Sequence, residues 1–557
     1  MHCRVTRPLI AAFAALALAA PAAAQSLSVT VAAPDGTPLA TDVYFPVGHG
    51  SAPWPAVLIR TPYGRQGSPV VTTCQLVNLQ GYACVAQDTR GRFGSGGTDT
   101  VFRDDGPDGR ATVAWIAAQS WCSGRVATYG GSAEGITQYA LAPDAPPQLV
   151  AMLAGAATPD VYHHAALQGG CLRKATAEAW LAGQGSLSFL EEFKSHRLWD
   201  TWWQPYIFLD HVDTVRVPAL HLGGWYDVFQ QGTLDAFTAY QHSGGPGAAG
   251  RQFLIMGPWT HATITQRSAG QLTYPANAAI DPLRLLGDWL AHWLDGAGND
   301  VEEWAPVRVY VMGAVGETGA PGNLWLDLAD WPPPTTRVSL YLASGGTLAS
   351  SRPAADSVPL TADPASPVPT LGGAELFPDL VVDGRAMGSG PYDQRPIEAR
   401  ADVLEFTSEV LREPVTVIGR LTAHVWVLPD TLDVDISVRI TDVYPDGRSM
   451  LVNDGIQRAR MRCGDDRECF LTPGEPTELT VDLWSTAIAF APGHRIRVDV
   501  AGSNAPRFEV NRNDGGDLDG TGAGVVAHPA ILLGGEHPSR VELPVVRVLR
   551  RRLPTAH

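Results

Sequence analysis

The sequence predicts a two-part protein in which an α/β unit built on a parallel sheet precedes an all-β sandwich. Three observations support this prediction. Short, uncharged, β-rich runs alternate with helical runs from about residue 27 to residue 300. Between residues 161 and 206 the strand pattern stops and aromatic residues gather. After about residue 300, alternating β-branched runs are separated by Pro, Gly and Asp.

The first unit contains strands and helices in turn. Predicted strands cover residues 55–60, 82–87, 125–129, 149–153, 217–222 and 253–256. Helical spacing is found at residues 71–80, 108–119 and 282–294. Uncharged strands with helices between them indicate a parallel sheet that is covered on both faces.

A helical cap is predicted to be inserted into this unit at residues 161–206. Its aromatic residues either line a substrate pocket or pack the cap helices against one another, and the sequence leaves both interpretations open: Trp180, Phe189, Phe193, Trp199, Trp202 and Trp203.

The second unit is predicted to be a β-sandwich, of jelly-roll type, that follows the helix at residues 282–294. Its predicted strands cover residues 308–312, 338–342, 415–427, 434–442, 478–483 and 495–500. We therefore divide the chain into a signal peptide (1–24), a catalytic domain (25–300) and a C-terminal domain (301–557).

The signal peptide is predicted from the pattern of the N-terminus. Arg4 and Arg7 precede an apolar run from Leu9 to Ala20, and small residues follow up to Ala24. The run is too short to span a bilayer comfortably. We expect cleavage after Ala24 and a mature protein that is periplasmic or secreted.

Export makes disulfides possible. Cys463 and Cys469 enclose a short polar loop, and we predict a bridge between them. Cys74–Cys84 is a second candidate pair. Spacing alone does not determine how the remaining cysteines pair. No cysteine spacing resembles a zinc site, and we expect neither a metal nor a cofactor.

Composition and net charge limit the classes of molecule that the protein is expected to bind. Among 557 residues, 45% are hydrophobic and 17% are charged, which is a globular composition with ample core material. The formal net charge is −17. Because a negative surface repels phosphate groups, we expect no nucleic-acid partner and no attachment to an anionic membrane. The sequence does not predict the oligomeric state.

A candidate nucleophile lies in Gly130-Gly131-Ser132-Ala133-Glu134-Gly135, between a predicted strand and a predicted helix. A serine on a tight strand-to-helix turn needs small neighbours, and the helix behind it presents free N–H groups where negative charge would develop. The usual G-x-S-x-G spacing is not met, because Glu134 holds the fifth position and Gly135 follows it.

Two further residues complete a candidate triad. Asp227 and His261 each follow a predicted strand, so the chain order is Ser…Asp…His, the order of α/β-hydrolases. Parallel strands bring these residues to one edge of the sheet. His261 would take the proton of Ser132, and Asp227 would orient the imidazole.

These and other segments resemble the bacterial cocaine esterase family (CocE/NonD hydrolases). That family is related to the X-prolyl dipeptidyl peptidases, the α-amino acid ester hydrolases and the glutaryl-cephalosporin acylases. The matching segments run through nearly the whole mature chain: Arg60-Thr61-Pro62-Tyr63-Gly64, Gln87-Asp88-Thr89-Arg90-Gly91, Trp121-Cys122-Ser123-Gly124, Gly130-Gly131-Ser132, Gly224-Trp225-Tyr226-Asp227, Gly257-Pro258-Trp259-Thr260-His261, Arg395-Pro396, Val403-Leu404-Glu405-Phe406 and Val500-Ala501-Gly502-Ser503-Asn504-Ala505-Pro506-Arg507-Phe508. The resemblance implies an α/β-hydrolase core, a helical cap and a C-terminal jelly roll.

The resemblance also implies an oxyanion hole made by the hydroxyl of Tyr63 and the backbone N–H of Ala133. Ala133 departs from the family, whose members usually carry Tyr after the nucleophile, and it leaves space beside the serine. Three residues are candidates for substrate binding: Glu134, Trp225 and Trp259.

Three functions remain open. The first is a serine hydrolase that cleaves a carboxylic ester or acyl amide of a small substrate with an apolar or aromatic acyl group. The second is an X-prolyl dipeptidyl peptidase or amide acylase that uses the same triad. This alternative is weakened because Val228-Phe229-Gln230-Gln231 after Asp227 offers no carboxylate for a substrate ammonium. The third is a catalytically inert ligand-binding protein.

Overall fold

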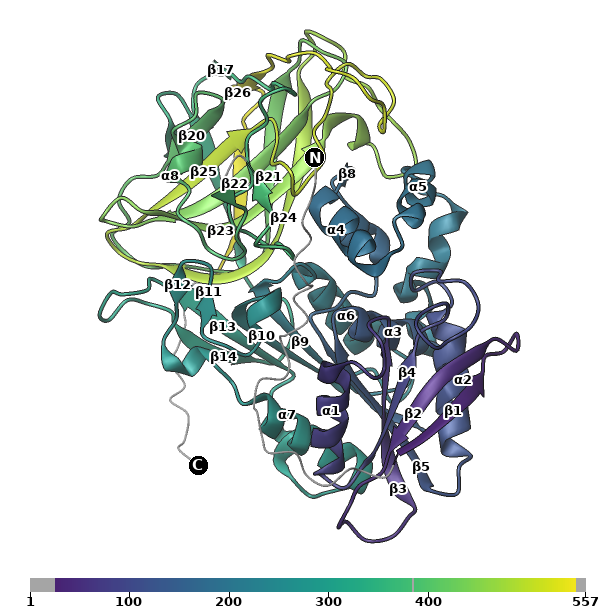
Figure 1. The fold of residues 1–557 in the computed structure, drawn as a ribbon. Coiled ribbons are helices and arrows are strands. Elements are labelled where there is room, and N and C mark those ends of the chain that lie inside the picture. The colour runs from purple at the N-terminus through teal and green to yellow at the C-terminus, as the bar shows by residue number, and fades with distance from the viewer. Residues whose placement is uncertain (1–25, 383–384, 547–557) are drawn as a thin grey trace.

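The computed structural model describes residues 26–382 and 385–546, so the predicted signal peptide lies outside the described residues. It contains a mixed sheet with helices and a C-terminal β-domain (Figure 1). In these ranges no helix combines the length and the apolar character needed to cross a membrane.

Parallel strands form the centre of the first sheet, in the order β4–β3–β5–β6–β9–β10–β13. Antiparallel strands extend both ends, β1 and β2 beyond β4 and β14 beyond β13. The bounds are β1 Ser26–Ala32, β2 Pro38–Tyr44, β3 Trp54–Thr61, β4 Ala83–Asp88, β5 Cys122–Gly131, β6 Leu149–Gly155, β9 Ala219–Tyr226, β10 Gln252–Thr260, β13 Val307–Gly313 and β14 Leu324–Leu328. Every strand predicted for the first unit is present.

Helices cover both faces of this sheet, as predicted. Successive strand residues point to opposite faces, so Leu58 packs in one buried cluster and Ile59 in another. The first cluster includes residues of α2 (Asp105–Ala117), α3 (Ala133–Leu141) and α6 (Gln230–Ser243). The second includes residues of α1 (Ser68–Asn78) and α7 (Pro282–Leu290). The strands are apolar on both sides because both sides are buried.

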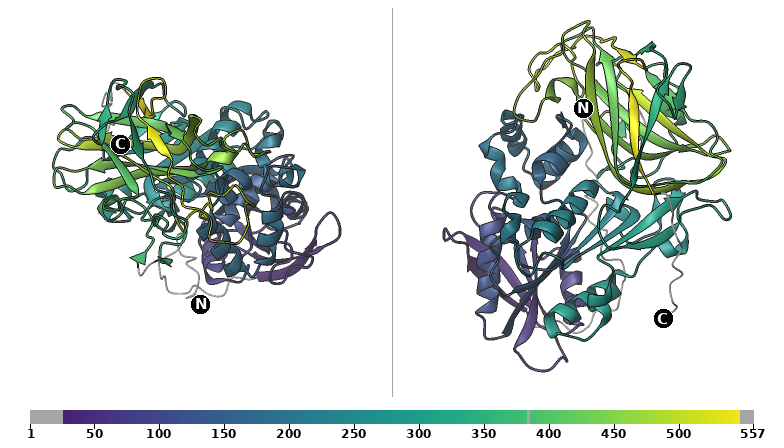
Figure 2. Two further views of the ribbon diagram at one scale, coloured as in Figure 1. Left: turned by 90° about the horizontal axis from the view of Figure 1, so that it is seen from above. Right: turned by 180° about the vertical axis from the view of Figure 1, so that it is seen from behind.

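A largely helical stretch connects β6 to β9, and we call residues 162–214 the helical segment. Figures 1 and 2 show it next to the C-terminal β-domain, above the sheet. The predicted insertion covered residues 161–206. The observed segment extends to residue 214, because a further 3-10 turn follows Tyr206. Its elements are η1 (Tyr162–Ala166), β7 (Leu167–Gln168), β8 (Cys171–Leu172), α4 (Lys174–Gln184), α5 (Ser188–Ser195), η2 (Thr201–Tyr206) and η3 (Phe208–Thr214).

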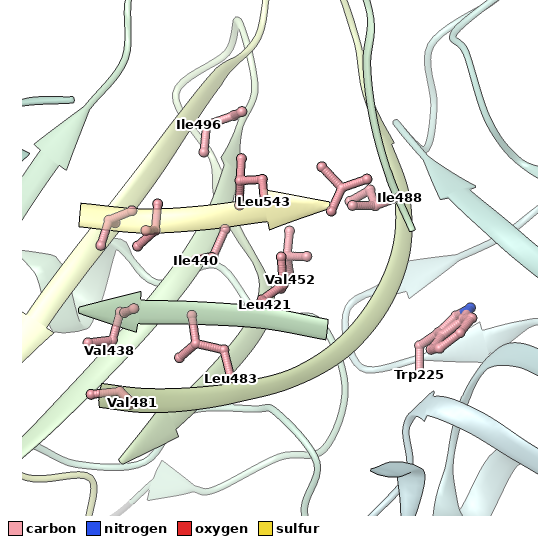
Figure 3. Close-up of a cluster of buried hydrophobic side chains, with 14 of the residues drawn as sticks. Trp225, Leu421, Val438, Ile440, Val452, Val481, Leu483, Ile488, Ile496 and Leu543 are labelled. Atoms are coloured by element: carbon pink, nitrogen blue, oxygen red, sulfur yellow. The ribbon is translucent and has the colours of Figure 1, made fainter. Parts of the chain in front are cut away.

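The C-terminal β-domain is built from antiparallel strands around an aliphatic core (Figure 3). Leu421, Val438, Val481 and Leu543 belong to one buried cluster that also contains Trp225 of the first sheet. The main strands are β15 Thr336–Ala343, β20 Val403–Thr407, β21 Val415–Leu428, β22 Asp435–Val443, β23 Ser449–Arg458, β24 Thr477–Phe490, β25 Arg495–Ala501 and β27 Arg540–Val545.

Strand β13 corrects one expectation. The run at residues 308–312 was predicted for the sandwich, but β13 pairs in parallel with β10 of the first sheet. Only Met312 and Gly313, at its end, pair with β24 of the β-domain. The partner of a strand depends on tertiary packing, which its own apolar pattern does not encode.

Two cysteine pairs lie at disulfide distance. Cys463 and Cys469 have their Cα atoms 6.1 Å apart, and Cys74 and Cys84 have theirs 5.2 Å apart. Both predicted pairs are therefore present. The two remaining described cysteines, Cys122 and Cys171, are buried free thiols.

Candidate active site

Ser132 lies on the sharp turn between β5 and α3. Its backbone has φ 58° and ψ −130°, a conformation that is strained for any residue other than glycine. Its N–H donates to the carbonyl of Gly155 (2.9 Å), and its own carbonyl accepts from Gly135 and Ile136. These bonds hold the strained serine at the N-terminus of α3, where helix N–H groups favour negative charge.

The glycines around Ser132 are required by close packing. A Cβ atom on Gly130 would lie 2.5 Å from Cβ of Glu134, and one on Gly135 would lie 2.5 Å from Cβ of Ala157. Gly135 therefore permits the close approach of α3 to the neighbouring strand end, one position later than the usual motif. The side chain of Glu134 lies over Gly130.

Asp227 and His261 form a hydrogen-bonded pair at the ends of β9 and β10. Nδ1 of His261 lies 2.7 Å from Oδ2 of Asp227, and the N–H of Phe229 donates to the other carboxylate oxygen (2.7 Å). Asp227 is fully buried, whereas the His261 side chain is 15% exposed. With Nδ1–H donating to the carboxylate, Nε2 of the neutral ring is free to accept a proton.

The hydroxyl of Tyr63 lies near the serine turn. It accepts a hydrogen bond from Nε1 of Trp180 (3.2 Å). Burial raises the pKa of Tyr63 above its usual value, and the interactions of the hydroxyl with Ser132 and the backbone of Ala133 oppose this rise. The phenol therefore stays protonated at neutral pH and can donate a hydrogen bond.

An apolar cavity of about 80 Å³ opens beside Ser132 and Ala133. None of the described residues that line it is charged. Part of its wall comes from the helical segment: Trp180, Phe189, Phe193, Trp203 and Tyr206. Phe229 also lines the cavity, and its ring packs edge-on against His261 with centroids 5.8 Å apart. The cavity therefore adjoins both the serine and the Asp227–His261 pair.

The aromatic residues of the predicted cap divide into two sets. Trp180, Phe189, Phe193 and Trp203 line the cavity, whereas Trp199 and Trp202 do not. The same ring cluster therefore packs the helices and forms part of the cavity wall. That this cavity binds the substrate stays a prediction. Three further lining residues carry no sequence pattern that could have identified them: Val101, Phe102 and Leu376.

The three candidate substrate-binding residues lie outside this cavity. Trp225 and Trp259 are almost fully buried in the core, and their indole N–H groups donate to the carbonyls of Tyr310 and Ala278. These contacts are structural and correct the expectation for both tryptophans. The carboxyl of Glu134 is hydrogen-bonded with Thr61, and burial raises its pKa to about 7.

In the described part of the chain, no group of three or more His, Cys, Asp or Glu side chains is placed to hold a metal ion. The arrangement instead offers a strained serine, an oriented imidazole, a protonated phenol and an apolar cavity. These are the parts that acyl transfer through a serine needs.

Both units of the chain match known protein families. Residues 35–188 and 182–263 match the X-Pro dipeptidyl-peptidase (S15) family, and residues 299–542 match the X-Pro dipeptidyl-peptidase C-terminal non-catalytic domain. Among solved structures, an aminopeptidase from a marine sediment Thaumarchaeota archaeon is similar with a TM-score of 0.79 and 25% identity, covering 94% of this chain and 96% of that one.

An α-amino acid ester hydrolase shares the fold, with a TM-score of 0.78 and 24% identity over 97% of this chain and all of that one. The cocaine esterase of Rhodococcus sp. (strain MB1 Bresler) is 31% identical, and the alignment covers 93% of this chain and 98% of the relative. The chain therefore belongs to the cocaine esterase family and is a hydrolase, either an esterase or a peptidase.

Proposed function

We propose that this chain is a serine hydrolase that cleaves a carboxylic ester, or an acyl amide, of a small substrate through an acyl-enzyme intermediate. Ser132 is the nucleophile, His261 the general base and Asp227 the residue that orients it. The observation that carries the proposal is the position of Ser132, which occupies a strained turn at a helix N-terminus and also lines an apolar cavity.

In this proposal Nε2 of His261 accepts the proton of Ser132 while the serine oxygen attacks the substrate carbonyl carbon. Asp227 stabilises the imidazolium through its 2.7 Å hydrogen bond. The imidazolium then gives its proton to the departing alkoxide or amine, which leaves an acyl-serine. Water then attacks the acyl-serine while Nε2 of His261 accepts its proton. This proton passes to the departing serine oxygen, and the acid is released.

Tyr63 and Ala133 form the oxyanion hole in this mechanism. The phenol and the backbone N–H meet beside Ser132, where the carbonyl oxygen would gain negative charge. Two donors that are already in place stabilise this charge without reorganising solvent.

The preferred acyl group is apolar or aromatic. The cavity beside Ser132 is uncharged and lined largely by aromatic rings, so it favours a group that loses little on leaving water. An X-prolyl dipeptidyl peptidase is the second candidate, favoured by the match to that family. Such an enzyme must hold a substrate ammonium, for which this cavity offers no carboxylate.

We further propose a catalytic domain at residues 25–300, with the helical segment as its cap, and a C-terminal domain at residues 301–557. The first strands of the C-terminal domain, β13 and β14, extend the sheet of the catalytic domain, and the later strands form the jelly roll. The signal pattern of residues 1–24 and the two disulfide pairs support export to the periplasm or beyond the cell.

A fluorophosphonate probe and matched substrates test the proposal. The probe should label the wild type at Ser132 and leave Ser132→Ala unlabelled, because it reacts only with an activated serine. A p-nitrophenyl ester should be cleaved faster than the anilide with the same acyl group and faster than an X-Pro anilide. Faster cleavage of the X-Pro anilide would favour the peptidase, and a wild type that the probe does not label would favour an inert binding protein.

A further inference from the structure

The loop closed by Cys463 and Cys469 contacts the helical segment from the C-terminal β-domain. We call residues 463–469 the disulfide loop. Its Asp465 makes two separate contacts: Oδ2 lies 3.1 Å from Nε2 of His163, and the backbone carbonyl accepts from the N–H of Trp199 (2.7 Å). One residue of the loop therefore holds the helical segment at two points that are 36 positions apart in sequence.

His163 is held from its other side by Asp160. Nδ1 of His163 lies 2.7 Å from Oδ2 of Asp160, and its backbone N–H donates to the second carboxylate oxygen (2.9 Å). Burial lowers the pKa of His163, but the hydrogen bonds with the two carboxylates outweigh burial and raise it to about 10. The imidazolium thus links Asp160, just before η1, to the disulfide loop as a charge-assisted contact.

Ring contacts lead from Trp199 to the cavity. Trp199 packs edge-on against Tyr162 (5.1 Å between centroids), and Tyr162 packs in the same way against Trp203 (4.8 Å). Trp203 packs against Phe193 (5.0 Å), and both of these rings line the cavity beside Ser132. The disulfide loop therefore contacts the outer side of the ring cluster whose inner side forms the cavity wall.

The helices of this wall need support from outside. α5 has eight residues and η2 has six, and helices this short are not stable on their own in water. Their positions depend on packing, on the ion pairs of Arg197 with Glu509 and Asp519, and on the contacts made by Asp465. The Cys463–Cys469 bond restricts the conformations of the loop that presents this residue.

We infer that the disulfide loop fixes the wall of the acyl cavity, and that Asp465 is a positioning residue that sets how well the enzyme accepts bulky acyl groups. This inference rests on the proposed function for the identity of the substrates. It assigns to the C-terminal β-domain a role in substrate selection that is exerted through the ring cluster and not through contact with the reacting atoms.

The two disulfides differ in exposure, which supplies an internal comparison. Cys463 is exposed and Cys469 partly exposed, whereas Cys74 and Cys84 are fully buried. Dithiothreitol under native conditions should therefore reduce the disulfide loop and spare the buried bond. One dithiothreitol thiolate attacks a loop sulfur and releases the first cysteine thiolate, which leaves a mixed disulfide. The second dithiothreitol thiol then attacks this bond and releases the second cysteine, so that two cysteine thiols and one cyclic disulfide result.

The central experiment compares Asp465→Asn with the wild type on p-nitrophenyl acetate and p-nitrophenyl benzoate. Asparagine keeps the backbone carbonyl for Trp199 but loses the carboxylate that pairs with His163. We expect KM for the benzoate to rise ~5-fold, with kcat/KM for the acetate changed by less than ~2-fold, because a displaced wall affects only the acyl group that fills the cavity. Asp466→Asn is the matched control, because the carboxylate of this neighbouring residue pairs with Arg467 of the same loop (3.6 Å).

Opening the disulfide gives an independent test. Cys463→Ser/Cys469→Ser should reproduce the selective rise in KM, and dithiothreitol should produce it in the wild type without adding to it in the double variant. Equal losses on acetate and benzoate, or unchanged KM for the benzoate in both variants, would overturn the inference.

A readout without catalysis separates this inference from the proposed function. Hydrogen exchange of backbone amides in residues 188–206 should accelerate in Asp465→Asn and in the double variant, but not in Asp466→Asn. Unchanged exchange would refute the positioning role even in an active enzyme. If the wild type cleaved neither ester, the proposed function would fail while the exchange experiment still tested the loop.

Discussion

The carboxyl edge of the sheet and the cavity wall opposite it are held in different ways. At the edge, Asp227 uses both carboxylate oxygens, and backbone hydrogen bonds fix Ser132. In the wall, Phe193 and Trp203 pack edge-to-face within a ring cluster, and the indole N–H of Trp203 adds one hydrogen bond to the carbonyl of His196 (2.7 Å). Directional bonds fix positions closely, whereas apolar packing tolerates changes that conserve volume. Substitutions at the edge should therefore change rates, and substitutions at the wall should change which substrates fit.

Removal of the proposed nucleophile should have the largest effect. Ser132→Ala should lower kcat/KM on the order of 10³-fold or more, because no acyl-enzyme can form. Circular dichroism and the thermal midpoint should match the wild type. Near-normal hydrolysis by this variant, with the fluorophosphonate on another serine, would remove Ser132 from the mechanism.

A change to the proposed oxyanion donor should come next. Tyr63→Phe should lower kcat by ~10²-fold with little change in KM, because the phenol acts mainly as charge develops. The control is Tyr206→Phe, since Tyr206 lines the same cavity but its hydroxyl donates to the carbonyl of Thr100 (3.1 Å). Equal effects of the two variants on kcat would mean that the oxyanion donor is elsewhere.

A change of cavity volume should have a smaller and selective effect. Ala133→Val keeps the backbone N–H but adds two methyl groups beside Ser132. We expect ~10-fold lower kcat/KM for p-nitrophenyl benzoate and little change for the acetate, because only the larger acyl group competes for this space. A parallel loss on both esters would instead indicate damage to the oxyanion hole.

Glu134→Gln should have the smallest effect on activity and a measurable one on stability. Burial raises the pKa of Glu134 from its usual 4.5 to about 7, so the folded state favours the protonated form. The stability that this residue contributes is complete below about pH 4.5 and is lost as the pH rises through about 7. In urea unfolding, the free energy of unfolding of the variant should rise relative to that of the wild type between pH 4.5 and 7, by at most about 3 kcal/mol. Partial exposure of the side chain to solvent makes the difference smaller.

The same variant tests the role of Glu134 in substrate choice. The carboxyl is not among the groups that line the cavity, so substrates with a free α-amine and their deaminated analogues should respond alike. A rise in KM for the amines alone would contradict this and favour the aminopeptidase. A stability difference that did not vary between pH 4.5 and 7 would contradict the raised pKa.

The strands of the first unit and the positions of Ser132, Asp227 and His261 at strand ends were predictable, because a buried parallel strand is a continuous apolar run that stops where polar residues begin. The cavity was less predictable. Val101 and Phe102 reach it from a loop in left-handed backbone conformations (φ 45° and 74°), and no local pattern indicates this. Trp225 and Trp259 show the converse, since proximity in sequence to Asp227 and His261, the proposed catalytic pair, did not place either side chain in the cavity.

The sharing of β13 between the two sheets bears on how this protein can be shortened or rearranged. β13 pairs with β10 along one edge, and its last residues pair with β24. A chain cut before β13 would leave β10 with a free, hydrophobic edge, which is a template for aggregation. Proteolysis or gene fission at this point should therefore yield an insoluble fragment and not a smaller enzyme.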